Sequence, residues 1–178
     1  MNVGAKSASD YGSYYAWGET STKSTYTWSN LKYCLNSSGD KFSKYVTKSK
    51  YGNVDGKIEL DLSDDAAYVN WGSGWRMPSK AQIEELRVKC KWTWTMMGGH
   101  NGYKVVGPRG VSIFLPVAYG WDESGFLDYD SYGWYWSRTL ETSYGYDYFA
   151  CYLDFNLDLS SATYRYEGFP VRAVCFSE

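Results

Sequence analysis

The pattern of apolar and polar residues predicts one well-defined helix in the first half of the chain. Ile83, Leu86 and Cys90 recur at helical spacing and form one apolar face. Ser79 and Gln82 have the separation of a capping box, in which each side chain bonds a backbone amide at the start of a helix. We therefore expect a helix that begins directly after Ser79.

Charged residues around this helix favour structural ion pairs. Lys80 with Glu84, and Glu85 with Lys89, are one helical turn apart and are expected to pair on the solvated side. Arg76, just before the helix, is expected to pair with a buried acid. These residues are therefore assigned to the scaffold and not to a ligand site.

A second, shorter helix is predicted at residues 63–69. Ser63 can accept a hydrogen bond at its N-cap, and the carboxylates of Asp64 and Asp65 favour the positive end of the helix dipole.

Strands are expected where apolar and polar residues alternate, or where short apolar runs lie between turn residues. The expected strands are residues 14–17, 91–95, 103–106, 111–116, 134–137, 148–155 and 171–176. A Gly-Pro-Arg-Gly sequence between the third and fourth of these indicates a hairpin turn. The predicted fold class is α+β, with two short helices followed by an antiparallel, loop-rich β region.

The C-terminal third is crowded with Tyr, Trp, Asp, Asn and Ser. There Leu153 and Phe155 alternate with Tyr152 and Asp154, so a strand would turn the ring and the acid away from the aliphatic core. Large stiff rings beside short polar groups are typical of recognition surfaces. We therefore predict a ligand-binding region within residues 121–167.

Composition narrows the classes of protein that the chain can represent. Its 178 residues are enough for one domain, residues 1–178, with its own core. With a formal net charge of -2 and no basic stripe, nucleic acid is not an expected partner. There is no apolar run long enough to insert in a membrane, and the N-terminus has no signal-peptide pattern.

Residues 19–57 form a polar segment that contains several aromatic residues. These aromatic residues predict an ordered loop that is pinned to the body, because a disordered linker carries few rings.

The chain has four cysteines, Cys34, Cys90, Cys151 and Cys175. They form no C-x-x-C pair, which disfavours a zinc site. Buried free thiols and two disulfides both remain open.

Catalytic chemistry has little support in the sequence. His100 is the single histidine and lies in a Gly-rich turn, so we expect no catalytic role for it. Carboxylates among aromatic residues keep a glycosidase as an alternative, since that chemistry needs two carboxyl groups beside a sugar-stacking ring. The candidates are Asp122, Glu123, Asp128, Asp130, Asp147, Asp154, Asp158 and Glu167.

Calcium is a second alternative, because hard oxygen ligands occur at close spacing. These ligands are Asp128, Asp130, Asp154, Asn156 and Asp158. The EF-hand glycine and distal glutamate are missing, so we predict neither a metal nor another cofactor.

Several motifs converge in order along the chain. They are Asn2–Ala5, Tyr11–Glu19, Asp64–Ala67, Trp71–Gly72, Trp75–Ser79, Asn101–Lys104, Ser112–Pro116, Tyr135–Ser137 and Gly168–Val174. Taken together, they resemble the Fibrobacter succinogenes major paralogous domain family over nearly the whole chain. The resemblance implies a C-type-lectin-like fold in a Bacteroidetes protein that is extracellular or on the cell surface. The E-P-N and W-N-D strings of calcium-dependent lectins are absent.

The C-terminal third is also similar to the variable region of proteins diversified by retroelements. The scaffold matches are Tyr135, Trp136, Ser137, Ala150, Leu153, Phe155, Arg165, Gly168, Val171 and Arg172. The resemblance implies exposed, ligand-binding variable positions at Trp134, Tyr144, Tyr146, Tyr148, Tyr152, Asp154, Asn156, Asp158, Tyr164, Tyr166 and Glu167. An ordinary member that is not diversified is equally compatible.

The function predicted from the sequence is therefore non-catalytic binding. The ligand would be a protein or a glycan on another cell or host surface. The alternatives are a carbohydrate-active enzyme and a structural adhesin or pilus-tip subunit.

Overall fold

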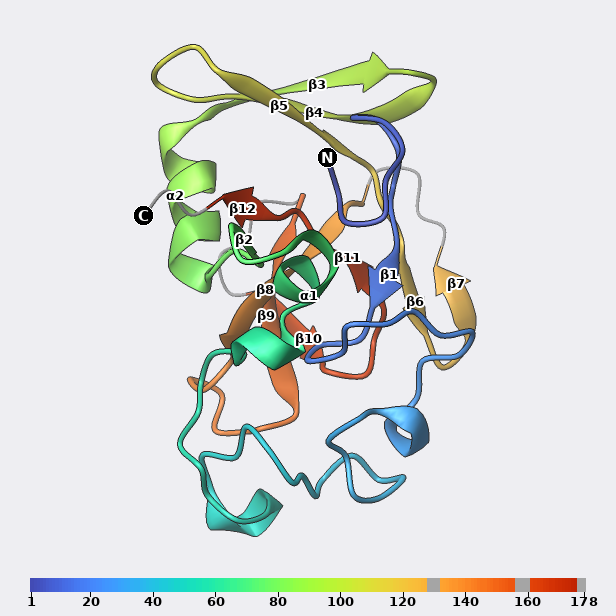
Figure 1. Cartoon of the computed structure of the whole chain (residues 1–178), viewed down its shortest axis with the longest axis vertical. Helices are drawn as coiled ribbons and strands as arrows, with labels where there is room; N and C mark the ends of the chain where they lie inside the picture. The colour runs from blue at the N-terminus through green and yellow to red at the C-terminus, as the bar shows by residue number, and fades with distance from the viewer. Residues whose placement is uncertain (128–131, 156–160, 176–178) are drawn as a thin grey trace.

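Figure 1 shows the computed structural model, which describes residues 1–127, 132–155 and 161–175. The helices are α1 (Ala66–Trp71) and α2 (Lys80–Lys89), with 3-10 turns at Trp28–Asn30, Ser49–Tyr51 and Leu62–Asp64. The strands are β1 (Tyr14–Tyr15), β2 (Trp75–Arg76), β3 (Lys91–Met97), β4 (His100–Val106), β5 (Ser112–Pro116), β6 (Gly120–Asp122), β7 (Gly125–Leu127), β8 (Trp134–Leu140), β9 (Phe149–Asp154), β10 (Ala162–Tyr164), β11 (Phe169–Pro170) and β12 (Val174–Cys175). The predicted α+β class is confirmed.

The strands form small antiparallel sheets. Three-stranded sheets have the orders β3-β4-β5 and β10-β9-β8, and the strand pairs are β1-β11, β12-β2 and β6-β7. Strands from the two ends of the chain therefore pair with each other, and the Val3 amide also donates to the Val171 carbonyl at 2.9 Å. This closure holds the C-terminal third against the body of the molecule (Figure 1).

Helix α2 begins where local chemistry predicted it. The Ser79 hydroxyl accepts from the Gln82 amide at 3.1 Å, and the Gln82 side chain accepts from the Ser79 amide at 2.9 Å. The predicted pair between Glu85 and Lys89 forms at 2.9 Å.

The second predicted pair on α2 is wrong. The Lys80 ammonium reaches the buried Glu141 carboxylate at 2.8 Å and does not pair with Glu84. Glu84 instead contacts Arg87, one turn further along the helix. A buried carboxylate offers a stronger electrostatic partner than a solvated one, so tertiary contact overrides helical spacing.

Helix α1 begins later than predicted, and Asp65 caps it in place of Ser63. The Asp65 carboxylate accepts from the Ala67 and Tyr68 amides. It also accepts from the Met77 amide at 3.0 Å and from Arg76 Nε at 2.8 Å. The buried acid expected for Arg76 is therefore Asp65, which ties α1 to β2.

The hairpin predicted around Gly107 is confirmed. Val106 pairs with Ser112 across β4 and β5, and the Gly107 amide donates to the Val111 carbonyl at 2.9 Å. The predicted strands at either end of the chain differ from expectation: β1 stops at Tyr15, and β12 begins only at Val174, while residue 176, the predicted end, lies outside the described residues. Both pair with single short partners, which limits their length.

Residues 19–57 form the ordered loop that their aromatic content predicted. Tyr26, Phe42 and Tyr45 are buried. Arg165 is also buried, with its guanidinium 4.9 Å from the Trp17 ring centroid and 4.5 Å from that of Phe42. In Figure 1 this loop lies at the end of the molecule away from the β3-β4-β5 sheet.

All four cysteines are free, so the disulfide alternative is wrong for this structure. Cys151 is buried and its thiol donates to Glu141 at 3.3 Å. Burial, with the nearby Glu141 carboxylate, raises the pKa of the Cys151 thiol to about 12. Cys175 is exposed on β12.

Candidate functional site

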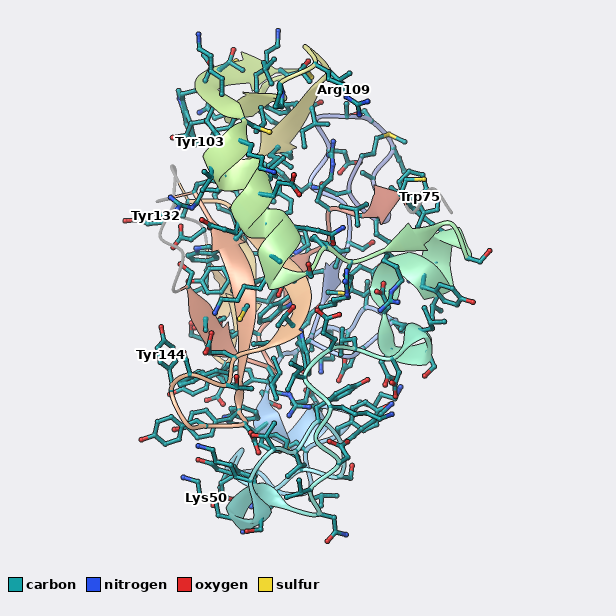
Figure 2. The ribbon with its side chains drawn as sticks, turned by 90° about the vertical axis from the view of Figure 1, so that its left-hand side faces the viewer. Lys50, Trp75, Tyr103, Arg109, Tyr132 and Tyr144 are labelled. Carbon is teal, nitrogen blue, oxygen red and sulfur yellow. The ribbon has the colours of Figure 1, made fainter. Side chains whose placement is uncertain are left out.

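Several exposed rings in the described part of the C-terminal third form a group that we call the tyrosine patch. Its members come from the loop before β9 and from β9 and β10: Tyr144, Tyr146, Tyr148, Phe149 and Tyr164. Tyr144 is 45% exposed, and Tyr146 and Tyr164 are each 40% exposed. Figure 2 shows Tyr144 projecting outward along one edge of the molecule.

The rings of the tyrosine patch support one another. Tyr146 stacks on Tyr148 with ring centroids 4.9 Å apart. Phe149 lies directly opposite Tyr164 in the β9–β10 ladder, with centroids 5.1 Å apart. Such contacts restrict the rings before any ligand arrives, which lowers the entropic cost of binding.

The 19–57 loop extends the tyrosine patch. Trp28 contacts Tyr164 at 5.6 Å, and Tyr51 contacts Tyr148 at 5.8 Å between ring centroids. The Lys50 ammonium lies 5.1 Å from the centroid of the Tyr146 ring, within cation–π range. The patch therefore joins two segments that are far apart in sequence, and the exposed Lys50 ammonium lies beside it.

Asp147 fixes the loop that carries the stacked tyrosines. Its buried carboxylate accepts from the backbone amides of Thr47 and Lys48, at 2.8 Å and 3.0 Å, and from the Thr47 hydroxyl. Asp147 lies between Tyr146 and Tyr148 in sequence, so its burial turns both neighbouring rings outward from the same anchor. Asp147 is thereby structural and is removed from the candidate catalytic carboxylates.

A second group of predicted residues lines a depression of about 450 Å³, which we call the acidic hollow. The described residues that line it are Asp122, Leu127, Tyr132, Trp134, Tyr152, Thr163, Glu167 and Phe169. Strand registers place it on the other side of the β8–β9–β10 sheet: Thr163 opposes Ala150, whereas Tyr164 opposes Phe149. The predicted residues thus form two groups and not one continuous face.

Aromatic rings form the wall of the acidic hollow. Phe169 lies 5.4 Å from Trp134 and 5.3 Å from Tyr152, and Tyr132 lies 6.1 Å from Trp134, between ring centroids. A side chain at Gly120 would come within 2.6 Å of the Phe169 ring and 3.0 Å of Trp134. Glycine at this position allows the rings to seat closely against β6.

Two carboxylates lie among these rings. Burial, reinforced by the negative charge of Asp122, raises the pKa of Glu167 to about 7, although a 2.7 Å hydrogen bond from Thr163 opposes the shift. Asp122 accepts from the amide and the hydroxyl of Ser124, at 2.7 Å and 2.6 Å. No salt bridge to either carboxylate is found within residues 1–127, 132–155 and 161–175.

The exposure predicted for the candidate variable positions is mostly found, with one error. Trp134, Tyr148, Tyr152, Asp154 and Glu167 are partly exposed. Tyr166 is only 8% exposed, so its prediction as a surface residue is wrong. Its ring lies under Trp28, at 4.7 Å between centroids. Asn156 and Asp158 lie outside the described residues.

Sequence reasoning missed the residues that other segments contribute. Lys50, Tyr51 and Trp28 come from the 19–57 loop, and Phe169 and Tyr132 belong to the acidic hollow. The aromatic content of the loop signalled that it was ordered, but no local pattern in the sequence indicated which surface it would join.

The calcium alternative gains no site in the part of the chain that the structure describes. Of the calcium candidates, only Asp154 lies in the described part of the chain. There, no group of three or more His, Cys, Asp or Glu side chains is placed to hold a metal ion. His100 opens β4 and packs edge-on against Tyr11, with ring centroids 4.7 Å apart.

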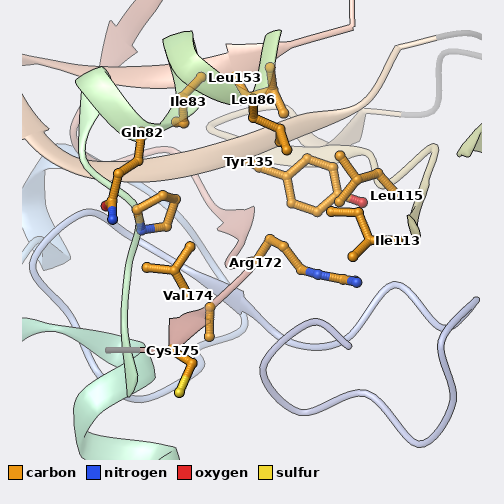
Figure 3. Close-up of a pocket in the computed structure, with 12 residues that line it drawn as sticks. Gln82, Ile83, Leu86, Ile113, Leu115, Tyr135, Leu153, Arg172, Val174 and Cys175 are labelled. Carbon is orange, nitrogen blue, oxygen red and sulfur yellow. The ribbon is translucent and has the colours of Figure 1, made fainter. Parts of the chain in front are cut away.

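A separate, mostly apolar cavity of about 270 Å³ lies beneath α2. Figure 3 shows Ile83 and Leu86 of α2 on one side, with Tyr135, Leu115 and Arg172 facing them. The Arg172 guanidinium donates to Asn2 Oδ1 at 3.3 Å and to the Phe114 carbonyl at 3.2 Å. This cavity contains none of the predicted site residues, so it is treated as part of the scaffold.

Comparisons with protein-family models, with curated proteins and with solved structures found no match. Among the described residues, no helix is both long enough and apolar enough to cross a bilayer.

Proposed function

We propose that this chain is a non-catalytic ligand-binding domain with a C-type-lectin-like fold, and that the tyrosine patch is its contact surface. The observation that carries the proposal is the exposure of three rings, Tyr144, Tyr146 and Tyr164, which all contact Phe149 on an anchored loop and strand edge. Rigid tyrosines of this kind supply large contact areas at low entropic cost.

The fold assignment has support from connectivity. Strands near the two ends of the chain pair antiparallel, as β1 with β11, and β12 pairs antiparallel with β2 from the middle of the chain. Between them lie two helices and a long stretch of loops and short strands. The ordered motifs shared with the Fibrobacter succinogenes major paralogous domain family point the same way. The same resemblance implies that the protein is extracellular or on the cell surface.

The ligand class is a protein or a glycan on another cell or host surface. Tyrosines with a neighbouring lysine suit both, because rings stack on sugar faces and also fill protein pockets. If the C-terminal third is diversified by a retroelement, the encoding DNA would lie near a reverse transcriptase. A near-copy of the segment would then differ only at adenines.

Binding arrays test the proposal directly. The purified domain and a Tyr144→Ser/Tyr146→Ser/Tyr164→Ser variant would be applied to a glycan array and to an array of cell-surface proteins. Trp94→Ser is the matched control, because Trp94 is a similarly exposed ring, 44% exposed, on β3. We expect a signal that the triple variant loses and the control keeps. Equal signals from all three proteins, or none from the wild type, would refute the proposal.

A glycoside hydrolase is a second candidate that one observation favours. Glu167 has the raised pKa of a general acid and lies in a ring-lined hollow with Asp122. Turnover of chromogenic glycosides that disappears in Glu167→Gln would support this candidate over binding alone.

A further inference from the structure

The acidic hollow combines aromatic rings with carboxylates. Its wall is built from the rings of Tyr132, Trp134, Tyr152 and Phe169. Two carboxylates, Asp122 and Glu167, line the same depression. Ring faces are negative at their centres, so both features attract positive charge.

The protein itself supplies no cation to this place. No Lys or Arg within salt-bridge distance of Asp122 or Glu167 is found in residues 1–127, 132–155 and 161–175. The sequence has no basic residue at 128–131, 156–160 or 176–178 either. Two fully buried carboxylates elsewhere on the molecule, Asp64 and Glu141, each pair with lysine.

The charges around Glu167 are of one sign. Burial raises the pKa of Glu167, and Asp122 on β6 raises it further. Burial also raises the pKa of the neighbouring Tyr166 phenol, and Glu167, Glu123 and Asp122 add to that shift. Among the described residues, the other titratable groups that line the hollow are the phenols of Tyr132 and Tyr152. A ligand that brings a positive charge relieves this repulsion, whereas a neutral sugar does not.

We propose that the acidic hollow binds an organic ammonium group, held by the Trp134 and Tyr152 rings and by the Asp122 and Glu167 carboxylates. This proposal rests on the proposed binding function and adds a second contact site to the tyrosine patch. It also gives the chemical class of the ligand group that this second site would bind. The same chemistry is carried by a lysine side chain of a protein partner and by a small quaternary ammonium compound.

Proton linkage gives the proposal a pH dependence. The free Glu167 carboxyl has a pKa of about 7 and must lose its proton to pair with a cation. With a tenfold weaker affinity for the protonated carboxyl, binding is expected to be about sevenfold weaker at about pH 5.5 than at about pH 8. A ligand held by the rings alone would show no such change.

Calorimetry on the intact domain tests this with defined probes. Choline represents the quaternary ammonium source, and acetyl-lysine amide with a free side-chain amine represents the protein source. Dimethylbutanol is the neutral isostere of choline. We expect one or both ammonium probes to bind with the stated pH dependence, and the isostere to bind at least tenfold more weakly. Which probe binds better identifies the source.

Variants localise the effect. Glu167→Gln and Asp122→Asn are each expected to weaken ammonium binding roughly tenfold, as for loss of one close charge partner. Glu85→Gln, an exposed carboxylate paired with Lys89 on α2, is the matched control and should bind like the wild type. The wild-type pH profile keeps the test valid if a variant fails to fold.

Four outcomes would overturn the proposal. They are equal binding of choline and its isostere, binding of a neutral sugar or of Ca²⁺ but of neither ammonium, pH-independent affinity, and no binding of any probe. None of these depends on the tyrosine patch, because the array experiment removes Tyr144, Tyr146 and Tyr164 and leaves the hollow intact. Failure of either proposal is therefore distinguishable from failure of the other.

Discussion

The Asp147 carboxylate accepts the Thr47 backbone amide at 2.8 Å, joining the tyrosine-bearing loop to a segment that lies far from it in sequence. The outward direction of Tyr146 and Tyr148 therefore depends on a contact between two segments, the loop before β9 and the 19–57 loop. Arg165 strengthens the same junction by donating to the Asp147 carbonyl at 3.1 Å.

Removal of the Asp147 carboxylate should lower the stability of the domain. Asp147→Ala leaves the Thr47 and Lys48 amides without their acceptor, and we expect a cost of about 2 kcal/mol in the free energy of unfolding. Urea denaturation measures it. Asp40→Asn, at an exposed carboxylate, should change stability by less than about 0.5 kcal/mol. If both variants unfolded at the same urea concentration, Asp147 would not be an anchor.

The two predicted tyrosines on neighbouring strands should behave differently when truncated. Tyr152 contacts Phe169 and Trp136, which are both buried, so Tyr152→Ser should cost about 2–3 kcal/mol. Tyr164 is 40% exposed, and Tyr164→Ser should cost about 1 kcal/mol or less, from lost ring contacts. Thermal unfolding of the two variants side by side tests the contrast. The reverse order would mean that the exposure of these rings in solution differs from that described.

Glu167 should make the domain less stable as the pH rises. Its folded-state pKa of about 7 lies above the ordinary value of 4.5, so between these values the folded state holds more protons than the unfolded state. Ionising it in place costs on the order of 1–3 kcal/mol. Glu167→Gln should therefore be more stable than the wild type at about pH 8 and equal to it at about pH 4. Guanidinium denaturation at both pH values gives the difference, and a constant difference would contradict the prediction.

Asp64 should have the opposite effect on the pH dependence of stability, so that the domain loses stability as the pH falls. Burial alone would raise its pKa, but hydrogen bonds from Lys44, Tyr33 and Tyr45 hold that pKa well below its usual range. This stabilisation is present above the ordinary pKa and is lost as the pH falls below it. Asp64→Asn is expected to cost about 3 kcal/mol at neutral pH and less at about pH 2–3. A cost that does not shrink in acid would show that the charge is unimportant.

The thiols should differ in reactivity. Cys175 is exposed and should react at once with a chromogenic disulfide reagent at about pH 8. Cys151 is buried, with a pKa of about 12, and should react only after denaturant is added. Cys175→Ser should remove the fast phase and leave the Cys151 reaction unchanged. A fast phase that persisted in this variant would count against the assignment.

Features governed by neighbouring residues could be predicted from the sequence. The capping box of Ser79 and Gln82 starts α2 where expected. The Gly-rich turn defines the β4–β5 hairpin, and the alternation of Leu153 with Tyr152 gives the buried and partly exposed sides of β9. Each depends on interactions within a few positions of the chain, so the local pattern contains the information.

Long-range packing changed the predictions that depended on it. Ser63 and Asp65 are both good caps, but only Asp65 also meets the Met77 amide and Arg76. Tyr164 and Tyr166 lie two positions apart in the same aromatic run, and yet one is exposed while Trp28 helps to bury the other. Lys80 likewise leaves its helical neighbour for Glu141.

The sequence by itself determined the helix start, the hairpin, the ordered loop and the richness of the C-terminal third in rings and acids. Only the tertiary structure decided which rings reach solvent, and it alone separated the tyrosine patch from the acidic hollow. The tertiary structure also places Asp122 and Glu167 together in the acidic hollow. The physical reason is that secondary structure follows from contacts between near neighbours, whereas burial and pKa depend on whatever distant segment packs against a side chain.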